Sequence, residues 1–239
     1  MLAKDRIIVA LDFSDWDTAK NMVDELAPHV GYFKFGLEAI TAPTIKTPKV
    51  IDHIHERGGK VFYDGKFNDI PNTVGQSVKN IVSMGVEMFN VHASCGIKAM
   101  RAVAEHKGTA IALAVSVLTS LEENNAHLIY GKPSKAAVLQ FAREAALGKM
   151  DGIICSPLEL KILSENPELD HLLRVTPGIR PAGSSKDDQA RITTPGQAVG
   201  NGATYLVIGR PITKTTSPRI AATRIATEIE TALQSIKEA

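Results

Sequence analysis

The feature that most constrains the fold of this chain is a repeated alternation of short apolar, β-rich runs with longer amphipathic stretches. Strands that alternate with helices pair in parallel through right-handed crossovers. Eight such units in 239 residues predict an α/β fold, a (β/α)8 TIM barrel that forms a single domain over residues 1–239. The expected strands are 6–12, 31–37, 60–66, 86–92, 109–118, 151–156, 172–178 and 203–209.

The stretches between the expected strands have helical periodicity and helix-end signals. We expect Ser14 to cap the first helix, and we expect a later helix to begin with Ser134 as its cap and to stop at Gly148. A doubly wound sheet is the main alternative, but it usually has fewer strands and a glycine-rich loop after the first strand. The first expected strand leads into LDFSDWD, which contains no glycine, so the barrel is favoured.

The charge balance and the cysteine content restrict the partners and the compartment. Lys and Arg number 27 against 26 acidic residues, so no overall field would draw the chain to nucleic acid or to a membrane surface. Cys95 and Cys155 are too few for a disulfide framework and suit a reducing compartment. The apolar run at the N-terminus is too short for a secretory signal. We therefore expect a soluble cytoplasmic protein.

Charged residues gather where several of the expected strands end. In a TIM barrel the active site lies at the carboxyl ends of the strands. Asp12 ends the first expected strand, Lys34 lies on the second, and the third carries Asp64 and Lys66, with Asp69 beyond it. Residues two apart on a strand share a face, and buried charges are tolerated when they are paired. The pattern predicts a chain of alternating sign, which is either a structural ladder of ion pairs or a catalytic site.

Two further strand ends indicate a phosphate subsite. TPGIRP brings Gly178 to the end of the seventh expected strand, and VIGRPI brings Gly209 and Arg210 to the end of the eighth. Barrels often bind phosphate at these loops, through backbone N–H groups and arginine. The alternative is a tight glycine turn with a surface arginine. Gln189 lies in the irregular stretch 178–196, where it is either solvated or part of a lid.

The remaining candidates carry weaker signals. His92 ends the fourth expected strand, where a histidine is more often a hydrogen-bonded core residue than a catalyst. Ser116 lies near the end of the fifth. The sequence contains no HxH, CxxC or HExxH pattern, so no metal site is expected.

The segment DGKFNDIPNT (64–73) resembles the D-x-K-x-x-D-I-P-N-T segment of the orotidine 5′-phosphate decarboxylase family. Further matches appear in the family's order and span nearly the whole chain: LD at 11–12, FKFG at 33–36, VLTS at 117–120, TPGIRP at 176–181, Gln189 and IGRPI at 208–212. The resemblance implies a homodimeric TIM-barrel carboxy-lyase of pyrimidine biosynthesis. It implies decarboxylation of orotidine 5′-monophosphate to uridine 5′-monophosphate (UMP) with no cofactor and no metal.

The resemblance also implies a role for each matching residue. Lys66 is the proton donor to carbon 6 of the pyrimidine, and Asp64 lies against the substrate carboxylate. Asp69 and Thr73 are contributed across the dimer interface, where Asp69 completes the charge array. The remaining implied substrate-binding residues are Asp12 and Lys34 at the ribose, Ser116 at the base edge, Gln189 between base and phosphate, Gly209 and Arg210 at the phosphate, and Pro177.

Some residues depart from the family pattern. Gly65 stands where an aliphatic residue is common, Asn68 where histidine is frequent, and Cys95 where a second glycine is usual. Ser116 stands where bacterial members often carry threonine. None of these departures removes a charged group, although the lack of bulk at Gly65 is expected to loosen the third strand.

Three other functions compete with the decarboxylase. A magnesium-dependent sugar-phosphate decarboxylase or aldolase could use the same D-x-K-x-x-D strand with Glu38 as a ligand, and metal dependence would separate the two. A Schiff-base aldolase needs a lysine of lowered pKa, whereas flanking carboxylates would keep Lys66 charged. A catalytically silent phosphate-binding barrel would not need the four alternating charges.

Overall fold

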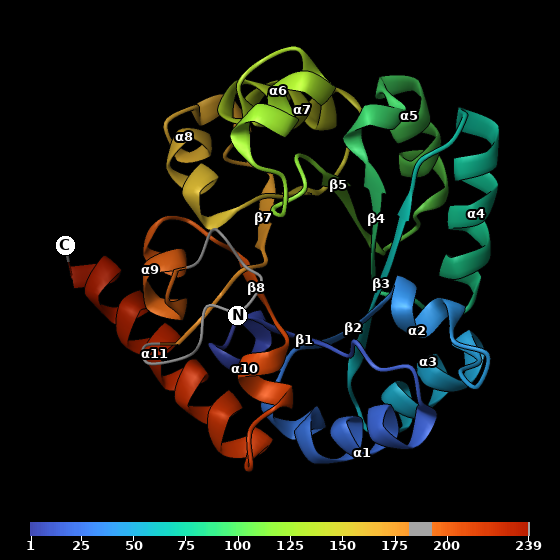
Figure 1. The fold of residues 1–239 in the computed structure, drawn as a ribbon, viewed down its shortest axis with the longest axis vertical. Coiled ribbons are helices and arrows are strands. Elements are labelled where there is room, and N and C mark those ends of the chain that lie inside the picture. The colour runs from blue at the N-terminus through green and yellow to red at the C-terminus, as the bar shows by residue number, and fades with distance from the viewer. Residues whose placement is uncertain (182–192, 239) are drawn as a thin grey trace.

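The strands form the closed parallel barrel that the alternation predicts. The computed structural model describes residues 1–181 and 193–238, and in it the strands pair in the order β1-β2-β3-β4-β5-β6-β7-β8, with β8 returning to β1. Each of the eight expected strands is confirmed. Figure 1 shows them around the centre of the molecule with the helices outside. The strands are β1 (Ile7–Ala10), β2 (Tyr32–Gly36), β3 (Lys60–Phe67), β4 (Met88–His92), β5 (Ile111–Val115), β6 (Gly152–Ile154), β7 (Leu173–Thr176) and β8 (Tyr205–Ile208).

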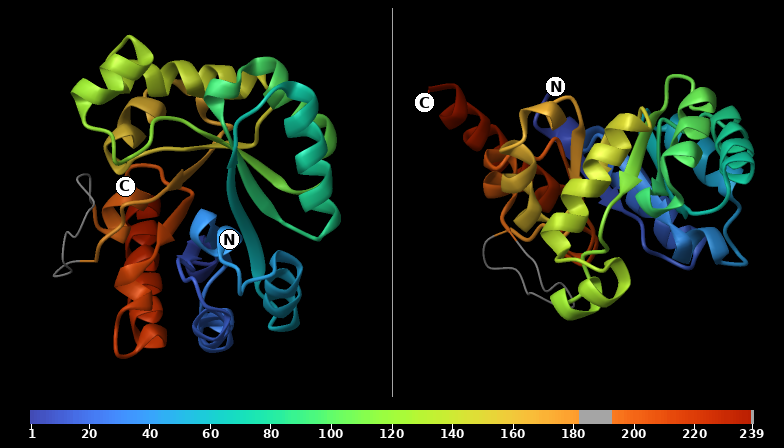
Figure 2. Two further views of the ribbon diagram at one scale, coloured as in Figure 1. Left: turned by 45° about the vertical axis from the view of Figure 1, so that its right-hand side comes forward. Right: turned by 90° about the horizontal axis from the view of Figure 1, so that it is seen from above.

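The helices pack around the outside of the barrel. Figure 2 shows this outer layer from two sides, with the C-terminal end of α11 extending past its neighbours. None of the helices in residues 1–181 and 193–238 is long and apolar enough to span a membrane. The helices are α1 (Trp16–Leu26), α2 (Leu37–Thr41), α3 (Thr47–Glu56), α4 (Pro71–Ser83), α5 (Ile97–His106), α6 (Glu123–Tyr130), α7 (Ser134–Leu147), α8 (Leu160–Ser164), α9 (Pro195–Gly200), α10 (Arg210–Thr213) and α11 (Pro218–Glu238).

Alternation along the strands builds two separate cores. Residues that face outward from the strands pack against the helices and form the larger core, to which Phe33, Val61 and Phe89 belong. Residues that face inward fill the lower part of the barrel interior. This inner cluster, the barrel floor, consists of Ile8, Tyr32, Phe62, Met88, Leu113, Val175 and Tyr205. On β2, β3 and β4 the next inward positions above the floor are Lys34, Asp64 and Asn90, so on these strands the two-residue period places polar side chains toward the mouth.

The first helix begins one residue later than its expected cap implies. Asp15, not Ser14, is the cap, and its carboxylate accepts a hydrogen bond from the N–H of Thr18 at 2.8 Å. The Ser14 hydroxyl instead donates to Glu38 at 2.9 Å. The prediction was wrong because two adjacent residues could each cap the helix, and the carboxylate is the one that reaches the free N–H.

The cap expected at Ser134 is also wrong, and the structure shows a substitute. Ser134 is the first helical residue of α7, and Pro133 occupies the cap position. The carboxylate of Glu123 on α6 accepts from the Ser134 N–H at 2.9 Å and from its hydroxyl. A side chain from the preceding helix therefore supplies the cap that sequence spacing assigned to a local residue. The stop at Gly148 is confirmed.

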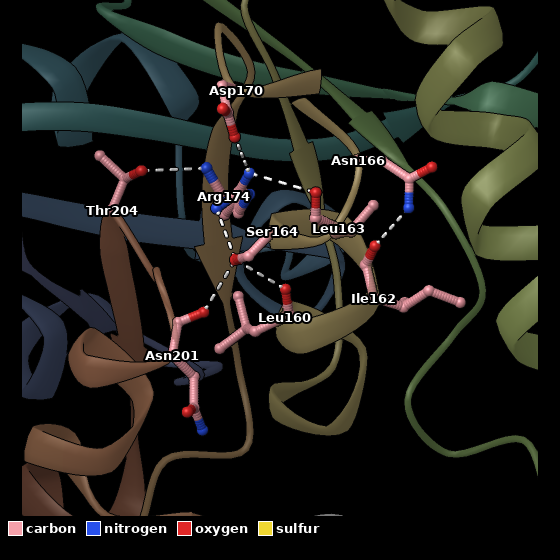
Figure 3. Close-up of polar contacts among 9 residues, drawn as sticks. All are labelled: Leu160, Ile162, Leu163, Ser164, Asn166, Asp170, Arg174, Asn201 and Thr204. Carbon is pink, nitrogen blue, oxygen red and sulfur yellow. Dashed lines mark hydrogen bonds and ion pairs between the residues drawn. The ribbon is translucent and has the colours of Figure 1, made fainter. Parts of the chain in front are cut away.

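Arg174, a buried arginine on β7, hydrogen-bonds the segments that precede β7 and β8. Arg174 on β7 donates to the Ser164 hydroxyl at 2.9 Å and to Asp170 at 3.1 Å, and its backbone N–H donates to the Thr204 hydroxyl at 3.1 Å (Figure 3). Gly202, which has a φ of 98°, leaves room for this side chain, because a Cβ there would lie 2.8 Å from Nη1 of Arg174. The network fixes β7 and the entry to β8, the two strands that lead into the expected phosphate subsite.

Candidate active site

A cavity of about 260 Å³ opens at the carboxyl ends of the strands. Apolar walls come from Phe62, Val115, Leu118, Ile154 and Val207, together with other residues of β5 and its following loop. The cavity brings together these residues expected from the sequence: Asp12, Lys34, Asp64, Lys66, Pro177, Gly178, Gly209 and Arg210. Charge and glycine backbone therefore meet in one concave, partly apolar space, which is the usual form of a small-molecule site.

The charged residues of β1, β2 and β3 form a continuous chain of ion pairs. The Lys34 ammonium lies 3.2 Å from Oδ1 of Asp12 and 3.0 Å from Oδ2 of Asp64. The Lys66 ammonium donates to Oδ1 of Asp64 at 2.7 Å. Asp64 is thus the shared anion between two cations. The β2–β3 register explains the geometry, because Lys34 is one inward position below the residue that pairs with Asp64.

Burial and charge act in opposite directions on this array. Burial alone would favour the neutral form of the Asp64 carboxyl, but the Lys34 and Lys66 ammonium groups outweigh it and hold the pKa of Asp64 well below its usual range. Burial likewise opposes the charge of Lys34, and the Asp64 and Asp12 carboxylates outweigh it and raise the pKa of Lys34. The lowered pKa of Asp64 and the raised pKa of Lys34 both favour the charged form of the residue. Both groups are charged at neutral pH, so the site presents fixed ionic charge inside a partly apolar cavity.

The strand that carries the array is locally irregular. The pairing of β3 with β4 shifts register between Tyr63 and Phe67, and Lys66 has a left-handed φ of 47°, which is uncommon for a residue with a Cβ. A Cβ at Gly65 would lie 2.5 Å from the Tyr63 ring. Glycine is therefore the residue that fits at this bulge, because the stacked rings of Tyr63 and Phe67 occupy the space that an aliphatic side chain would need.

Sequence reasoning missed two residues of the site. Asn90, fully buried on β4, hydrogen-bonds both Asp64 and the backbone N–H of Lys66. Its signal was a single amide within an apolar strand, in the same inward phase as His92. Arg180 follows Gly178 in TPGIRP, is 7% exposed and lines the cavity. Its signal was an arginine two residues after a cavity-lining glycine.

Three of the expected residues lie outside the cavity wall. Asp69 is exposed, and its carboxylate accepts from the N–H of Ile70 at 2.7 Å. Thr73 is exposed in the first turn of α4. Ser116 is buried, and its hydroxyl donates to the Ile154 carbonyl at 2.7 Å. None of these three lines the cavity, and Gln189 lies outside the described residues.

Burial also shifts the pKa values of one histidine and of the two cysteines. Burial, together with the nearby Lys66 ammonium, lowers the pKa of His92 despite the Asp64 carboxylate. Burial raises the pKa of the Cys95 thiol to about 11 and that of the Cys155 thiol to about 12. Both thiols are therefore protonated at neutral pH, and a protonated thiol is a poor nucleophile.

Metal-binding geometry is absent from the described residues. In residues 1–181 and 193–238 no group of three or more His, Cys, Asp or Glu side chains converges as metal ligands would. Glu38, the ligand that a magnesium-dependent enzyme would recruit, is exposed on α2 and accepts its hydrogen bond from Ser14. It does not line the cavity.

Comparison with known proteins shows the family to which this chain belongs. The sequence model described as the orotidine 5′-phosphate decarboxylase / HUMPS family matches residues 5–225. The orotidine 5′-phosphate decarboxylase of Moorella thermoacetica is 43% identical and aligns over 96% of this chain and 94% of its own length. That of Nitrosospira multiformis is 42% identical over 94% of each chain.

Solved structures give the same result. The crystal structure of orotidine 5′-phosphate decarboxylase from Lactobacillus acidophilus superimposes with a TM-score of 0.80 at 34% identity, covering 93% of this chain and 98% of that one. The enzyme of the same name from Pyrococcus horikoshii, with a TM-score of 0.74 at 22% identity, supports the barrel fold alone. On the matching motifs, the barrel and the full-length similarity, this chain belongs to the orotidine 5′-phosphate decarboxylase / HUMPS family and is a carboxy-lyase within it.

Proposed function

We propose that this carboxy-lyase converts orotidine 5′-monophosphate to UMP without a cofactor, within one barrel domain over residues 1–239. Its catalytic Lys-Asp-Lys-Asp array consists of Lys34, Asp64 and Lys66, with Asp69 contributed by a partner copy. The observation that carries the proposal is the Lys66 ammonium, which lines the cavity and contacts Asp64 at 2.7 Å. A phosphate-binding barrel without chemistry has no use for four linked charges. The decarboxylation needs them, for the following reasons.

The reaction breaks the bond between carbon 6 and the carboxylate, and the electron pair remains on the ring carbon as carbon dioxide leaves. Negative charge then develops where the ring delocalises it poorly. A fixed cation at that point stabilises the transition state without reorganising solvent. Lys66 supplies this charge and then transfers its proton to carbon 6, forming the new C–H bond. Its neutral amine regains a proton from water before the next turnover.

Asp64 has two effects in this scheme. Its carboxylate lies between Lys34 and Lys66, so it holds both ammonium groups in position. It also places negative charge where the substrate carboxylate is expected to bind, and the repulsion between them diminishes as carbon dioxide leaves. Since the Asp64 pKa is held low, the residue remains anionic when substrate binds. An interaction that improves toward the transition state increases kcat.

The other end of the cavity fits the phosphate of the same substrate. Gly178, Gly209 and Arg210 line it, from the loops that follow β7 and β8. Pro177 forms the adjoining wall. Phosphate contacts remote from the reacting carbon supply binding energy that positions the base over Lys66. We assign Gln189 to the same end on the resemblance alone.

Ribose and base complete the assignment. Asp12 lies beside Lys34 at the cavity edge, where both can hydrogen-bond ribose hydroxyls. Ser116 is assigned to the base edge. Because its hydroxyl already donates to Ile154, it can only accept a hydrogen bond from the base in this arrangement.

The proposed array needs Asp69, which must then come from a second copy of the chain. Asp69 is exposed and bonded to its own neighbouring backbone, outside the cavity wall of its own barrel. Thr73 lies one helical turn farther along the same exposed segment. We therefore propose a homodimer in which Asp69 and Thr73 of each copy enter the partner's cavity, where Asp69 becomes the fourth charge beside Lys66.

The test is the ultraviolet absorbance change as the purified chain consumes orotidine 5′-monophosphate, measured with and without EDTA. We expect turnover that is insensitive to EDTA and that falls by at least about 10⁴-fold in Lys66→Ala, since both charge stabilisation and proton donation are lost. Lys60→Ala is the matched control, because Lys60 lies on the same strand at its other, exposed end. Turnover that requires magnesium would favour the sugar-phosphate enzymes, and a folded wild-type chain without turnover would sink the assignment.

A further inference from the structure

The fourth strand contributes a buried amide to a site whose charged groups come from the first three. Asn90 is fully buried in the middle of β4, and its neighbours Phe89 and Val91 face outward into the helical core. By alternation the Asn90 side chain faces inward, one position above Met88 of the barrel floor. A buried amide is costly unless it is hydrogen-bonded, so its partners indicate why it is there.

Both ends of the Asn90 amide bind β3. The Nδ2 group donates to Oδ1 of Asp64 at 2.6 Å, and Oδ1 of Asn90 accepts from the backbone N–H of Lys66 at 2.8 Å. The Lys66 ammonium donates to the same carboxylate oxygen at 2.7 Å. One side chain therefore holds a catalytic carboxylate and the backbone of the catalytic lysine together, and the three residues close a ring of contacts.

The ring coincides with the backbone irregularity. The β3–β4 register shifts between Tyr63 and Phe67, and Lys66 has the left-handed φ of 47°. At that point the Asn90 amide oxygen accepts the Lys66 N–H in place of a strand carbonyl. A left-handed conformation at a residue with a Cβ persists when its surroundings hold it. The described partner that performs this function is Asn90.

We propose that Asn90 is a positioning residue: it holds the β3 bulge so that the Lys66 ammonium stays beside Asp64 and inside the cavity. The inference rests on the proposed function, because it takes Lys66 as the proton donor. Asn90 does not line the cavity, so it acts through Asp64 and Lys66 and not on the substrate. Preorganisation of this kind belongs to the supporting residues of an active site.

The first test compares Asn90→Ala with Val91→Ala. Val91 is the matched control because it is equally buried on the same strand and faces the helices. We expect kcat to fall by about 10- to 100-fold in Asn90→Ala, the size of losing hydrogen bonds to a charged group, with KM changed by less than about threefold. Val91→Ala lowers the melting temperature and leaves kcat near the wild-type value. An Asn90→Ala variant that keeps kcat within about threefold of the wild type would overturn the proposal.

The second test is the pH profile of Asn90→Asp, which keeps the acceptor for Lys66 and replaces the donor to Asp64 by a carboxylate. The charged and titratable groups around this position are Asp64 and Lys66 on β3, Lys34 on β2 and His92 on β4 itself. As pH falls, the carboxylate introduced at position 90 and that of Asp64 share a proton, and this proton restores a hydrogen-bond donor between the two side chains. We expect kcat to rise by about tenfold toward acid pH in this variant and not in the wild type. A profile parallel to that of the wild type would contradict the role.

The third test needs no substrate. A crystal structure of Asn90→Ala should show Lys66 leaving the left-handed region, with its ammonium separated from Asp64. An unchanged φ and an unchanged contact would overturn the proposal even if activity were lost. A wild-type chain that does not turn over orotidine 5′-monophosphate would instead sink the proposed function, and this structure would still decide whether Asn90 holds the bulge.

Discussion

Two sides of the same barrel mouth hold their polar groups in different ways. On the β1–β4 side, Asp12, Lys34, Asp64, Lys66 and Asn90 hold one another through side chains, with contacts of 2.6 to 3.2 Å. On the β7–β8 side, the cavity is lined by Gly178 and Arg180 from the loop after β7, and by Gly209 and Arg210 at the start of α10.

Backbone contacts join the two ends of the loop that follows β7. The Ile179–Thr193 bridge and the Arg180 N–H, which donates to Thr193 at 2.9 Å, join the two ends of the segment between them. A preformed ionic array suits chemistry, because charge that is fixed before substrate arrives costs no reorganisation. Glycine backbone and arginine on loops suit recognition of an anion that arrives and leaves. The comparison predicts that damage to the first side changes kcat and damage to the second changes KM.

The largest effect is expected at the shared anion. Asp64→Asn removes charge from the centre of the array while keeping its shape, so Lys34 and Lys66 repel each other without compensation. We expect kcat to fall by about 10³-fold with a much smaller change in KM. Steady-state kinetics measures both. A variant whose KM rises while kcat is retained would place Asp64 in binding and break the comparison.

The next effect belongs to the other side. Arg210→Ala removes a cation from the expected phosphate end, and we expect KM to rise by about 30-fold, roughly 2 kcal/mol, with kcat reduced by a smaller factor. Arg224→Ala, on the exposed surface of α11, is the control. If Arg210→Ala lowered kcat and left KM unchanged, the assignment of substrate binding to the β7–β8 side would be wrong.

Inorganic phosphate sharpens the same contrast without the base or the ribose. Because phosphate needs only the β7–β8 side, we expect it to inhibit competitively, with an inhibition constant that rises by about tenfold in Arg210→Ala. The same constant should stay unchanged in Lys34→Ala, although that variant loses activity. Equal weakening in both variants would mean that phosphate binds the array itself.

The smallest effect is on stability in acid. Asp64 has a folded pKa below its unfolded value. Its contribution to stability is therefore fully present above the usual carboxyl range and is lost progressively as pH falls from that range through the folded pKa. With an unfolded pKa of about 3.9, the loss between pH 5 and pH 3 is about 1 kcal/mol. Urea unfolding at the two pH values, in the wild type and in Asp64→Asn, measures it. Identical pH dependence in the two proteins would mean that Asp64 is not held ionised by the array.

The sequence predicted the barrel well, because buried parallel strands are continuous apolar runs and each has its own turn signals. It also predicted the Lys34–Asp64–Lys66 contacts, since strand periodicity and adjacency are enough to place them. Helix caps were less predictable: Asp15 competed with Ser14, and the group that caps α7, Glu123, comes from another helix.

The residues that were missed depend on contacts between distant parts of the chain. Asn90 has no local partner, and its two hydrogen bonds exist only because β3 bulges opposite it. Arg180 lines the cavity because of the path of a loop, which spacing does not determine. The outward placement of Asp69 likewise follows from the turn after β3, and the periodicity of the strand stops short of it.

The barrel floor limits how substrate, proton and products can enter and leave the cavity. Its side chains, from Ile8 to Tyr205, are at most 8% exposed, so within the described residues the barrel axis is sealed beneath the charged array. Within the described residues, the cavity is closed at its lower end by the floor and opens at the carboxyl ends of the strands. Each turnover consumes one proton at carbon 6 and releases carbon dioxide, and Lys66 must be reprotonated afterwards. The proton that enters, and the carbon dioxide and UMP that leave, therefore all pass through the barrel mouth. In the proposed catalytic cycle both products must leave through it before the next substrate can bind.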